Sequence, residues 1–264
     1  MPSVMPEIDR VTLKLTIRRF EEITLNTAPA IHEYCLDGWM LRASGTATHR
    51  SNSVTILNDS TLALPEKIQR CESWFRQHQQ PVIFRLNEAL APADLDEILA
   101  ARGYTKNSES LVMTVDGSAV GGASVLPAGV RLVECGMVES LRELHQLKGN
   151  SPELAQREIA RQMQWHGPQI VLNLRSIDGL ACTGMARIED GHVGLFDIFT
   201  PVEQRGHRFA TTLISYLLAW GLEHGAVAAF LQVLEANQSA INVYQRLGFV
   251  PRYRYWSRVG PEPP

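Results

Sequence analysis

The pattern of apolar and polar positions predicts alternating strands and helices in the first half of the chain. Apolar runs bounded by turn residues predict strands at 33–42, 52–57, 82–86 and 111–115. Two segments opened by prolines place apolar side chains at three- and four-residue spacing, which is typical of amphipathic helices; they are 65–78 and 92–102. Strands interleaved with helices favour a mixed α/β (α+β) fold over an all-helical or all-β one.

The second half repeats this alternation. Its apolar runs predict strands at 130–134, 170–175, 180–188, 192–199, 228–234 and 253–258. Its helical periodicity predicts helices at 138–147, 152–165, 208–223 and 239–247. The turns Asp178-Gly179 and Asp190-Gly191 favour hairpins, so we expect mixed, mostly antiparallel sheets flanked by helices.

A stretch rich in glycine and serine separates the two halves. Residues 116–129 show no hydrophobic periodicity, which is typical of a flexible connection between two packed units. We therefore expect one domain at 1–116, a linker at 117–129 and a second domain at 130–264.

Both expected domains close on the same short pattern, a helix followed by glycine, an aromatic residue and a strand. The pairs are Gly103-Tyr104 and Gly248-Phe249. An internal duplication would explain this repeated pattern. Ordinary helix-ending chemistry, in which glycine supplies the left-handed cap, explains it too.

Composition and charge narrow the function classes. The 264 residues are 45% hydrophobic and 20% charged, enough to bury a full core. The formal charge of -3 gives no basic excess, so we expect neither nucleic acid nor a membrane surface as partner. The four cysteines lie far apart, which predicts no metal site and favours a reducing compartment. Residues 1–10 lack a signal-peptide core, and the longest apolar stretch, 213–222, is too short to span a bilayer, so a cytoplasmic location is expected.

Candidate chemistry lies where the expected strand at 192–199 turns into the next helix. A helix start leaves several backbone N–H groups unpaired and can bind a phosphate. Gly206 allows close backbone approach, and Arg205, His207 and Arg208 add potentially cationic donors. An ordinary corner with solvated charges is the alternative interpretation.

A second informative stretch starts at Asn237, a good helix N-cap. Ala240 and Tyr244 are four residues apart and share one helix face. A single buried tyrosine is more often a core residue than a catalytic one, so this stretch carries weight only together with the corner before it.

Together, these two stretches resemble the GNAT acyl-CoA-dependent N-acetyltransferases. The family's loop, Arg/Gln-x-x-Gly-x-Gly/Ala, is similar to residues 205–210, and its Asn-x-x-Ala-x-x-x-Tyr-x-x-x-Gly-Phe signature matches residues 237–249. The resemblance covers about 130–258. The first half resembles a member of the same superfamily without the cofactor loop. The resemblance thus implies two tandem GNAT-like domains, the N-terminal one degenerate.

The resemblance also implies a cofactor, acetyl-CoA, and residues to hold it. These are Ile198, Phe199, Thr200, Arg205, Gly206, His207, Arg208, Phe209, Ala210, Thr211 and Asn237. It implies that a primary amine of a small molecule or peptide attacks the thioester directly, and that Tyr244 donates a proton to the leaving thiolate. Without Tyr244 acting in this way, the chain would be a non-catalytic acyl-CoA-binding or protein-interaction module on the same fold.

Two positions depart from the family pattern. Arg208 stands where glycine is usual, and we expect the cationic cluster to retain phosphate binding. Gln232 stands where some members carry a basic glutamate, and glutamine cannot accept the proton of the amine. Asp197 is the candidate base, and a solvent-facing strand carboxylate is its alternative interpretation. Glu235 and a water chain are further candidates. A protein acyltransferase acting on lysine would instead need an acidic groove at the site.

Overall fold

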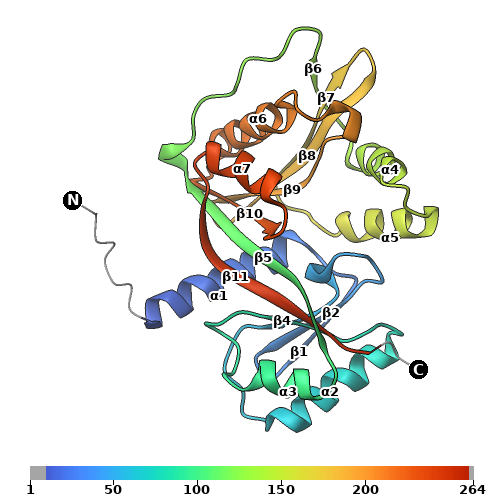
Figure 1. The fold of residues 1–264 in the computed structure, drawn as a ribbon, viewed down its shortest axis with the longest axis vertical. Helices are drawn as coiled ribbons and strands as arrows, with labels where there is room; N and C mark the ends of the chain where they lie inside the picture. The colour runs from blue at the N-terminus through green and yellow to red at the C-terminus, as the bar shows by residue number, and fades with distance from the viewer. Residues whose placement is uncertain (1–9, 262–264) are drawn as a thin grey trace.

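The computed structural model describes residues 10–261, except for the side chain of Ser108. Its strands form one continuous eleven-stranded sheet in the order β1-β2-β3-β4-β11-β5-β10-β9-β8-β7-β6 (Figure 1). Only β3·β4 and β9·β10 are parallel pairs, which confirms a mixed, mostly antiparallel sheet. No helix among residues 10–261 is long and apolar enough to cross a membrane. The expectation about a signal peptide concerns residues 1–10, of which 1–9 lie outside the described residues.

The second half follows the predicted order closely. Its elements are β6 (Arg131–Glu134), α4 (Met137–Leu147), α5 (Pro152–Gln162), β7 (Gln169–Ser176), β8 (Gly179–Glu189), β9 (His192–Phe199), α6 (Phe209–Glu223), β10 (Ala228–Leu234), α7 (Gln238–Arg246) and β11 (Val250–Val259). In Figure 1 they form the upper part of the molecule, with β11 running down into the lower part.

The first half contains two differences from the prediction. Its elements are α1 (Arg10–Thr27), β1 (His32–Leu36), β2 (Trp39–Ala43), β3 (Val54–Ile56), α2 (Leu64–Gln77), β4 (Ile83–Leu86), α3 (Leu95–Ala101) and β5 (Thr105–Asp116). The single strand predicted at 33–42 is wrong, because Asp37 and Gly38 both take positive φ and turn it into a hairpin. The helix α1 is the second difference, because it lies outside every helix predicted from the sequence.

The two halves exchange strands at the middle of the sheet. β5, from the first half, lies between β10 and β11, while β11, from the second half, lies between β5 and β4. Each half nevertheless has its own hydrophobic core, one around Leu213 and one around Trp39. The expected domains at 1–116 and 130–264 therefore share one sheet, and the bounds between them stay a prediction.

The connection expected at 117–129 begins with the short 3-10 helix η2 (Gly117–Ala119). Beyond it, Val120 and Leu126 pack against the core of the second half. The backbone N–H of Ser124 donates to the hydroxyl of Ser215 on α6, at 2.8 Å. These contacts hold the connection along the second half.

The halves also correspond to each other in their local geometry. Each contains a parallel strand pair whose second strand leads into a short helix, β4 into α3 and β10 into α7. Those helices end at Gly103 and Gly248, with φ of 85° and 87°, and the following Tyr104 and Phe249 are buried. This correspondence supports an internal duplication.

The sheet of the second half carries helices on both faces. Along β10, Leu231 and Val233 pack into the core that contains α6, whereas Phe230 packs against Ile23 of α1. Figure 1 shows α1 crossing the middle of the molecule between the two halves. One face of β9 and β10 therefore meets α6 and α7, and the opposite face meets α1.

Candidate active site

The site begins where β9 and β10 part. These strands pair only over three residues each, 192–194 with 228–230, and then continue to Phe199 and Leu234 without pairing to each other. Between β8 and β9 the register shifts by one extra residue of β9, and Asp197 there has a φ of 51°. Such a bulge bends the strand and frees backbone groups from the ladder. The end of β9 is therefore a free strand edge inside the molecule.

The loop after β9 leads into the N-terminus of α6. The 3-10 helix η3 (Val202–Gln204) is followed by Gly206, whose φ is 86° and around which a Cβ would meet nothing within 4 Å. Arg208 is the N-cap with a φ of 62° and makes no side-chain cap. The first N–H groups of α6 consequently have no intrahelical partner and face open space beside Gly206. This is the geometry that binds anions at helix starts.

A cleft of about 570 Å³ runs from this helix start to α7. Three of its lining residues are arginines, Arg205, Arg208 and Arg246, and none is an aspartate or glutamate. None of the three forms an ion pair within the described chain. Arg205 donates only to the carbonyl of Thr200, at 3.3 Å. The cleft therefore presents uncompensated positive charge.

The cleft brings together nearly all of the cofactor-binding residues predicted from the sequence. Those that line it are Ile198, Phe199, Thr200, Arg205, Gly206, Arg208, Phe209, Ala210, Thr211 and Asn237. His207 is not among the lining residues; its ring lies 5.5 Å from that of Phe209. Sequence reasoning missed Gln204, Ser239, Asn242 and Arg246. The available signal was helical spacing, since Asn242 and Arg246 are four residues apart on α7.

Tyr244 lines the same cleft from α7. Its residue is 9% exposed, and burial raises the pKa of its phenol to about 12. Its hydroxyl makes no hydrogen bond to the residues described, so it is available to a ligand. Asn237 caps α7 and so fixes the helix that carries Tyr244, because its side-chain oxygen accepts from the N–H of Ala240 at 3.1 Å.

Asp197 lies away from that cleft. Its carboxylate accepts from the amide of Gln162 on α5, at 3.2 Å, and it lines a small cavity under α4. Tyr244 and Asp197 therefore approach the parted strands from different sides. Gln232, on β10, is held by Thr24 and Tyr255 at 3.0 and 2.9 Å.

Glu235, the other carboxylate considered as a base, pairs with Arg254 on β11 at 3.2 Å. Its backbone N–H donates to the carbonyl of Glu109, at 2.9 Å. Both contacts fix the loop between β10 and α7, which is a structural role.

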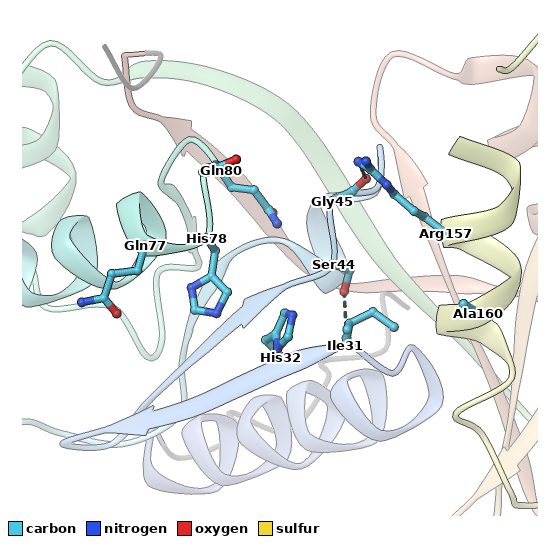
Figure 2. Close-up of a pocket in the computed structure, with 10 residues that line it drawn as sticks. Ile31, His32, Ser44, Gly45, Gln77, His78, Gln80, Arg157 and Ala160 are labelled. Atoms are coloured by element: carbon cyan, nitrogen blue, oxygen red, sulfur yellow. Dashed lines mark hydrogen bonds between the residues drawn. The ribbon is translucent and has the colours of Figure 1, made fainter. Parts of the chain in front are cut away.

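A second concavity, of about 600 Å³, lies at the junction of the halves (Figure 2). The rings of His32 and His78 lie next to each other in its lining, with ring centroids 4.9 Å apart. Arg157 of α5 reaches the carbonyl of Gly45 on the other side, at 3.5 Å. This concavity contains no helix start and none of the residues predicted for the cofactor. The cleft at α6 is thus the better candidate for an anionic coenzyme.

Comparison with known proteins agrees with this geometry. Residues 15–257 match the family described as "Probable histone acetyltransferase Rv0428c C-terminal". The chain is 28% identical to the "Uncharacterized N-acetyltransferase YobR" of Bacillus subtilis (strain 168), over 92% of this chain and 98% of that one.

Two solved structures share the fold over most of the chain. A GCN5-related N-acetyltransferase from Kribbella flavida has a TM-score of 0.69 at 16% identity, covering 92% of this chain and 95% of its own. A tandem GNAT protein from the clavulanic acid biosynthesis pathway has a TM-score of 0.61 at 19% identity, covering 85% and 79%. These likenesses confirm the predicted mixed α/β fold and its resemblance to tandem proteins.

Proposed function

This chain belongs to the family described as "Probable histone acetyltransferase Rv0428c C-terminal" and is an N-acetyltransferase of the GNAT superfamily, and from this premise we propose its donor, its acceptor and its acid. The donor is acetyl-CoA, bound in the cleft at the start of α6. The acceptor is a primary amine of a small molecule or peptide. Tyr244 is the general acid.

The observation that carries the proposal is the carboxylate-free cleft with three arginines at an open helix start. A coenzyme with a pyrophosphate needs backbone N–H donors and cations at one end of its site. Residues 206–211 supply the first and the arginines supply the second. The free edge at 198–200 offers backbone groups to an extended amide-containing arm. The residues therefore fit the coenzyme.

When bound, the coenzyme supplies an acetyl thioester whose carbonyl the acceptor amine attacks directly. The side chains around the parted strands then move the protons. Tyr244 stays protonated at neutral pH because burial raises its pKa to about 12, so it can donate to a developing thiolate. Its ring packs edge-on against that of Phe249, with ring centroids 6.0 Å apart.

The proton of the amine needs a different acceptor. An alkylamine with a pKa near 10.4 is only about one part in 10³ neutral at pH 7. Gln232 cannot take a proton, whereas the Asp197 carboxylate can. Asp197 lies on the α5 side of the parted strands, opposite Tyr244, so base and acid approach from opposite sides of the reacting group. We assign it as the general base.

The experiment compares Tyr244→Phe with the native chain, using acetyl-CoA and an amine panel, with coenzyme A release and product mass as readouts. Losing a positioned acid lowers kcat about 10²–10⁴-fold, while calorimetry finds the acetyl-CoA Kd unchanged within about threefold. Tyr216→Phe is the matched control, since it removes a half-buried phenol from α6 outside the cleft. Unchanged kcat in Tyr244→Phe overturns the assignment of the acid. Coenzyme binding without any turnover favours the non-catalytic module.

A further inference from the structure

Five arginines gather where α1, α5 and the loop after β2 meet the sheet of the second half. They are Arg42, Arg50, Arg85, Arg161 and Arg187. Their positive charges repel one another. In addition to burial, Arg161 lowers the pKa of both Arg42 and Arg187, and Arg50 also lowers the pKa of Arg187. Arginines this close together need compensating carboxylates or a ligand.

Three of the five are compensated within the chain. Each forms a short ion pair with a glutamate, at 2.5–2.8 Å: Arg42 with Glu33, Arg85 with Glu21 and Arg161 with Glu158. These pairs account for three positive and three negative charges. The remaining members of the cluster are therefore the ones that decide its net charge.

Arg187 is fully buried and donates only to neutral oxygens. Its partners are the carbonyls of Thr27 and Gln162, at 2.7 and 3.0 Å, and the side chain of Gln169, at 3.2 Å. Burial and the neighbouring Arg161 lower the pKa of Arg187 to about 9. Asp197 is the remaining carboxylate that acts on it. The negative charge of Asp197 offsets the positive charge of Arg187. Arg50 is then the member of the cluster whose charge no carboxylate among the described residues offsets.

Arg50 has no carboxylate partner within residues 10–261. It belongs to the 3-10 helix η1 (His49–Ser51) of the first half, and its guanidinium carbon lies 5.7 Å from the centroid of the Phe196 ring. Phe196 immediately precedes Asp197, the bulge residue at which β9 leaves β10. The half-buried guanidinium thus lies over the strand that borders the reacting position, on the face opposite α6.

We propose that Arg50 is the acceptor-binding cation of the enzyme, and that the acceptor is an amine that also carries a carboxylate. The inference rests on the proposed function, because it assumes that acetyl transfer occurs at the split between β9 and β10. Arginine binds a carboxylate through two parallel N–H···O bonds, which fixes orientation as well as charge. The first half, without a donor site of its own, supplies this residue.

The surplus positive charge also helps the chemistry of the second half. A neighbouring cation disfavours the protonated amine and lowers its pKa. An acceptor held beside Arg50 therefore has a larger neutral fraction than the same amine in water. The larger neutral fraction partly offsets the lack of a proton-accepting glutamate at position 232.

The rival acceptor is a lysine-rich protein segment, such as the histone named in the family description. A segment of that kind needs an acidic groove, because like charges next to each other are repelled. The arginine cluster offers the opposite charge. Acetylation of such a segment is therefore an outcome that contradicts the inference.

The test titrates N-acetylated amino acids with small, apolar, acidic and basic side chains, each beside its carboxamide, into protein saturated with coenzyme A. These probes are the products of the proposed reaction. We expect at least one acid to bind at least about tenfold more tightly than its amide, in line with a charge-assisted hydrogen bond. Arg50→Met, which keeps the apolar contact with Phe196, should bring that ratio close to one. Arg76→Met removes an exposed, unpaired arginine on α2 and is the matched control.

Each other outcome is informative. Equal binding of acids and amides, no binding of any probe, or a preference that survives in Arg50→Met overturns the inference. Turnover on lysine-rich peptides that exceeds turnover on free amino acids also overturns it. Calorimetry with acetyl-CoA alone is run in parallel. Intact coenzyme binding shows that only the acceptor assignment failed, whereas its loss shows that the proposed function failed.

Discussion

Two strand-to-helix corners, β9 to α6 in the second half and β3 to α2 in the first, share an order of elements and differ in the charges that surround them. At the corner from β9 to α6, the helix start opens on a cleft lined by three arginines, none of which forms an ion pair within residues 10–261. At the corner from β3 to α2, the chain supplies its own anion. The Asp37 carboxylate accepts from the backbone N–H groups of Thr61 and Leu62, each at 2.8 Å.

A buried cation, Lys67, pairs with Asp37 at the corner from β3 to α2, which we call the closed corner. Lys67 of α2 is fully buried, hydrogen-bonds to Asp37 and Ser60, and lies 4.1 Å from the Trp39 ring. The first half also has no counterpart of Tyr244, the proposed general acid. Counting back from the helix-ending glycines, the position of Tyr244 corresponds to Leu99 in the first half. The order strand, loop and helix thus encloses an internal ion pair in the first half, whereas in the second half it forms the cleft that we propose binds acetyl-CoA.

The largest expected effect is at the open corner, where β9 leads into α6. Replacing Arg205, Arg208 and Arg246 together by alanine should weaken acetyl-CoA binding at least about 10³-fold, since hydrogen bonds to charged groups contribute roughly 1.5–3 kcal/mol each. Calorimetry measures the change. The matched variant replaces Arg70, Arg76 and Arg102 of the first half and should leave Kd within about threefold. Similar losses in both triple variants would count against a localised site.

The next effect concerns the closed corner. Asp37→Ala should lower the thermal midpoint and leave the acetyl-CoA Kd unchanged. Hydrogen bonds from the Leu62 and Thr61 N–H groups lower the pKa of Asp37 to about 2. A lowered carboxyl pKa stabilises the fold above the unfolded value of about 3.9, and that contribution is lost as pH falls through 2.

The difference in midpoint between native protein and Asp37→Ala should accordingly be full at pH 5 and shrink towards pH 2. Scanning calorimetry at several pH values measures it. Asp59→Ala removes an exposed carboxylate that pairs with Lys14, and should change the midpoint less. A difference that grows on acidification would refute the role of Asp37.

A third prediction concerns Tyr244, the proposed general acid, whose counterpart in the first half is Leu99. Because burial raises the pKa of Tyr244 to about 12, its proton is retained throughout the usual assay range. The rate should rise with pH as the acceptor amine becomes neutral. At pH values up to about 11, ionisation of Tyr244 should cause no decrease in the rate. A stopped-flow pH profile of kcat measures this. A descending limb near pH 10 that disappears in Tyr244→Phe would contradict it.

The smallest expected effect is at Arg208, which occupies the usual glycine position with a φ of 62°. A left-handed non-glycine residue costs roughly 1–2 kcal/mol, so Arg208→Gly should raise stability by up to about 1 kcal/mol. Its lost charge should weaken coenzyme binding less than about tenfold. Arg205→Gly is the control, since Arg205 has an ordinary φ of -74° and glycine relieves no strain there. Denaturant unfolding distinguishes the two.

Local signals in the sequence predicted most of the second half. The Gly206 loop, the Asn237 cap and the spacing to Tyr244 act within a few residues, so pattern and spacing locate them. α1 escaped prediction because Val11, Leu13 and Leu15 alternate with polar residues as in a strand, and all three are exposed in the structure. The hairpin at Asp37-Gly38, by contrast, has a local signal, because an Asp-Gly pair favours a tight turn between strands.

The remaining features depend on distant parts of the chain. The exchange of β5 and β11 joins strands more than a hundred residues apart, and no local pattern indicates it. Asp37 reaches Leu62, and Arg50 reaches Phe196, only after folding. The sequence could therefore indicate where the proposed donor site lies in the second half, whereas the Asp37 contacts and the position proposed for Arg50 became visible only in the structure.

Hydrogen–deuterium exchange with and without acetyl-CoA tests the central claim most directly, because it locates the coenzyme in one half or the other. Acetyl-CoA should slow amide exchange at 198–211 and 237–246 and leave exchange at 58–67 unchanged. Protection at 58–67, or none at 198–211 with saturating coenzyme, would contradict the assignment of donor binding to the second half.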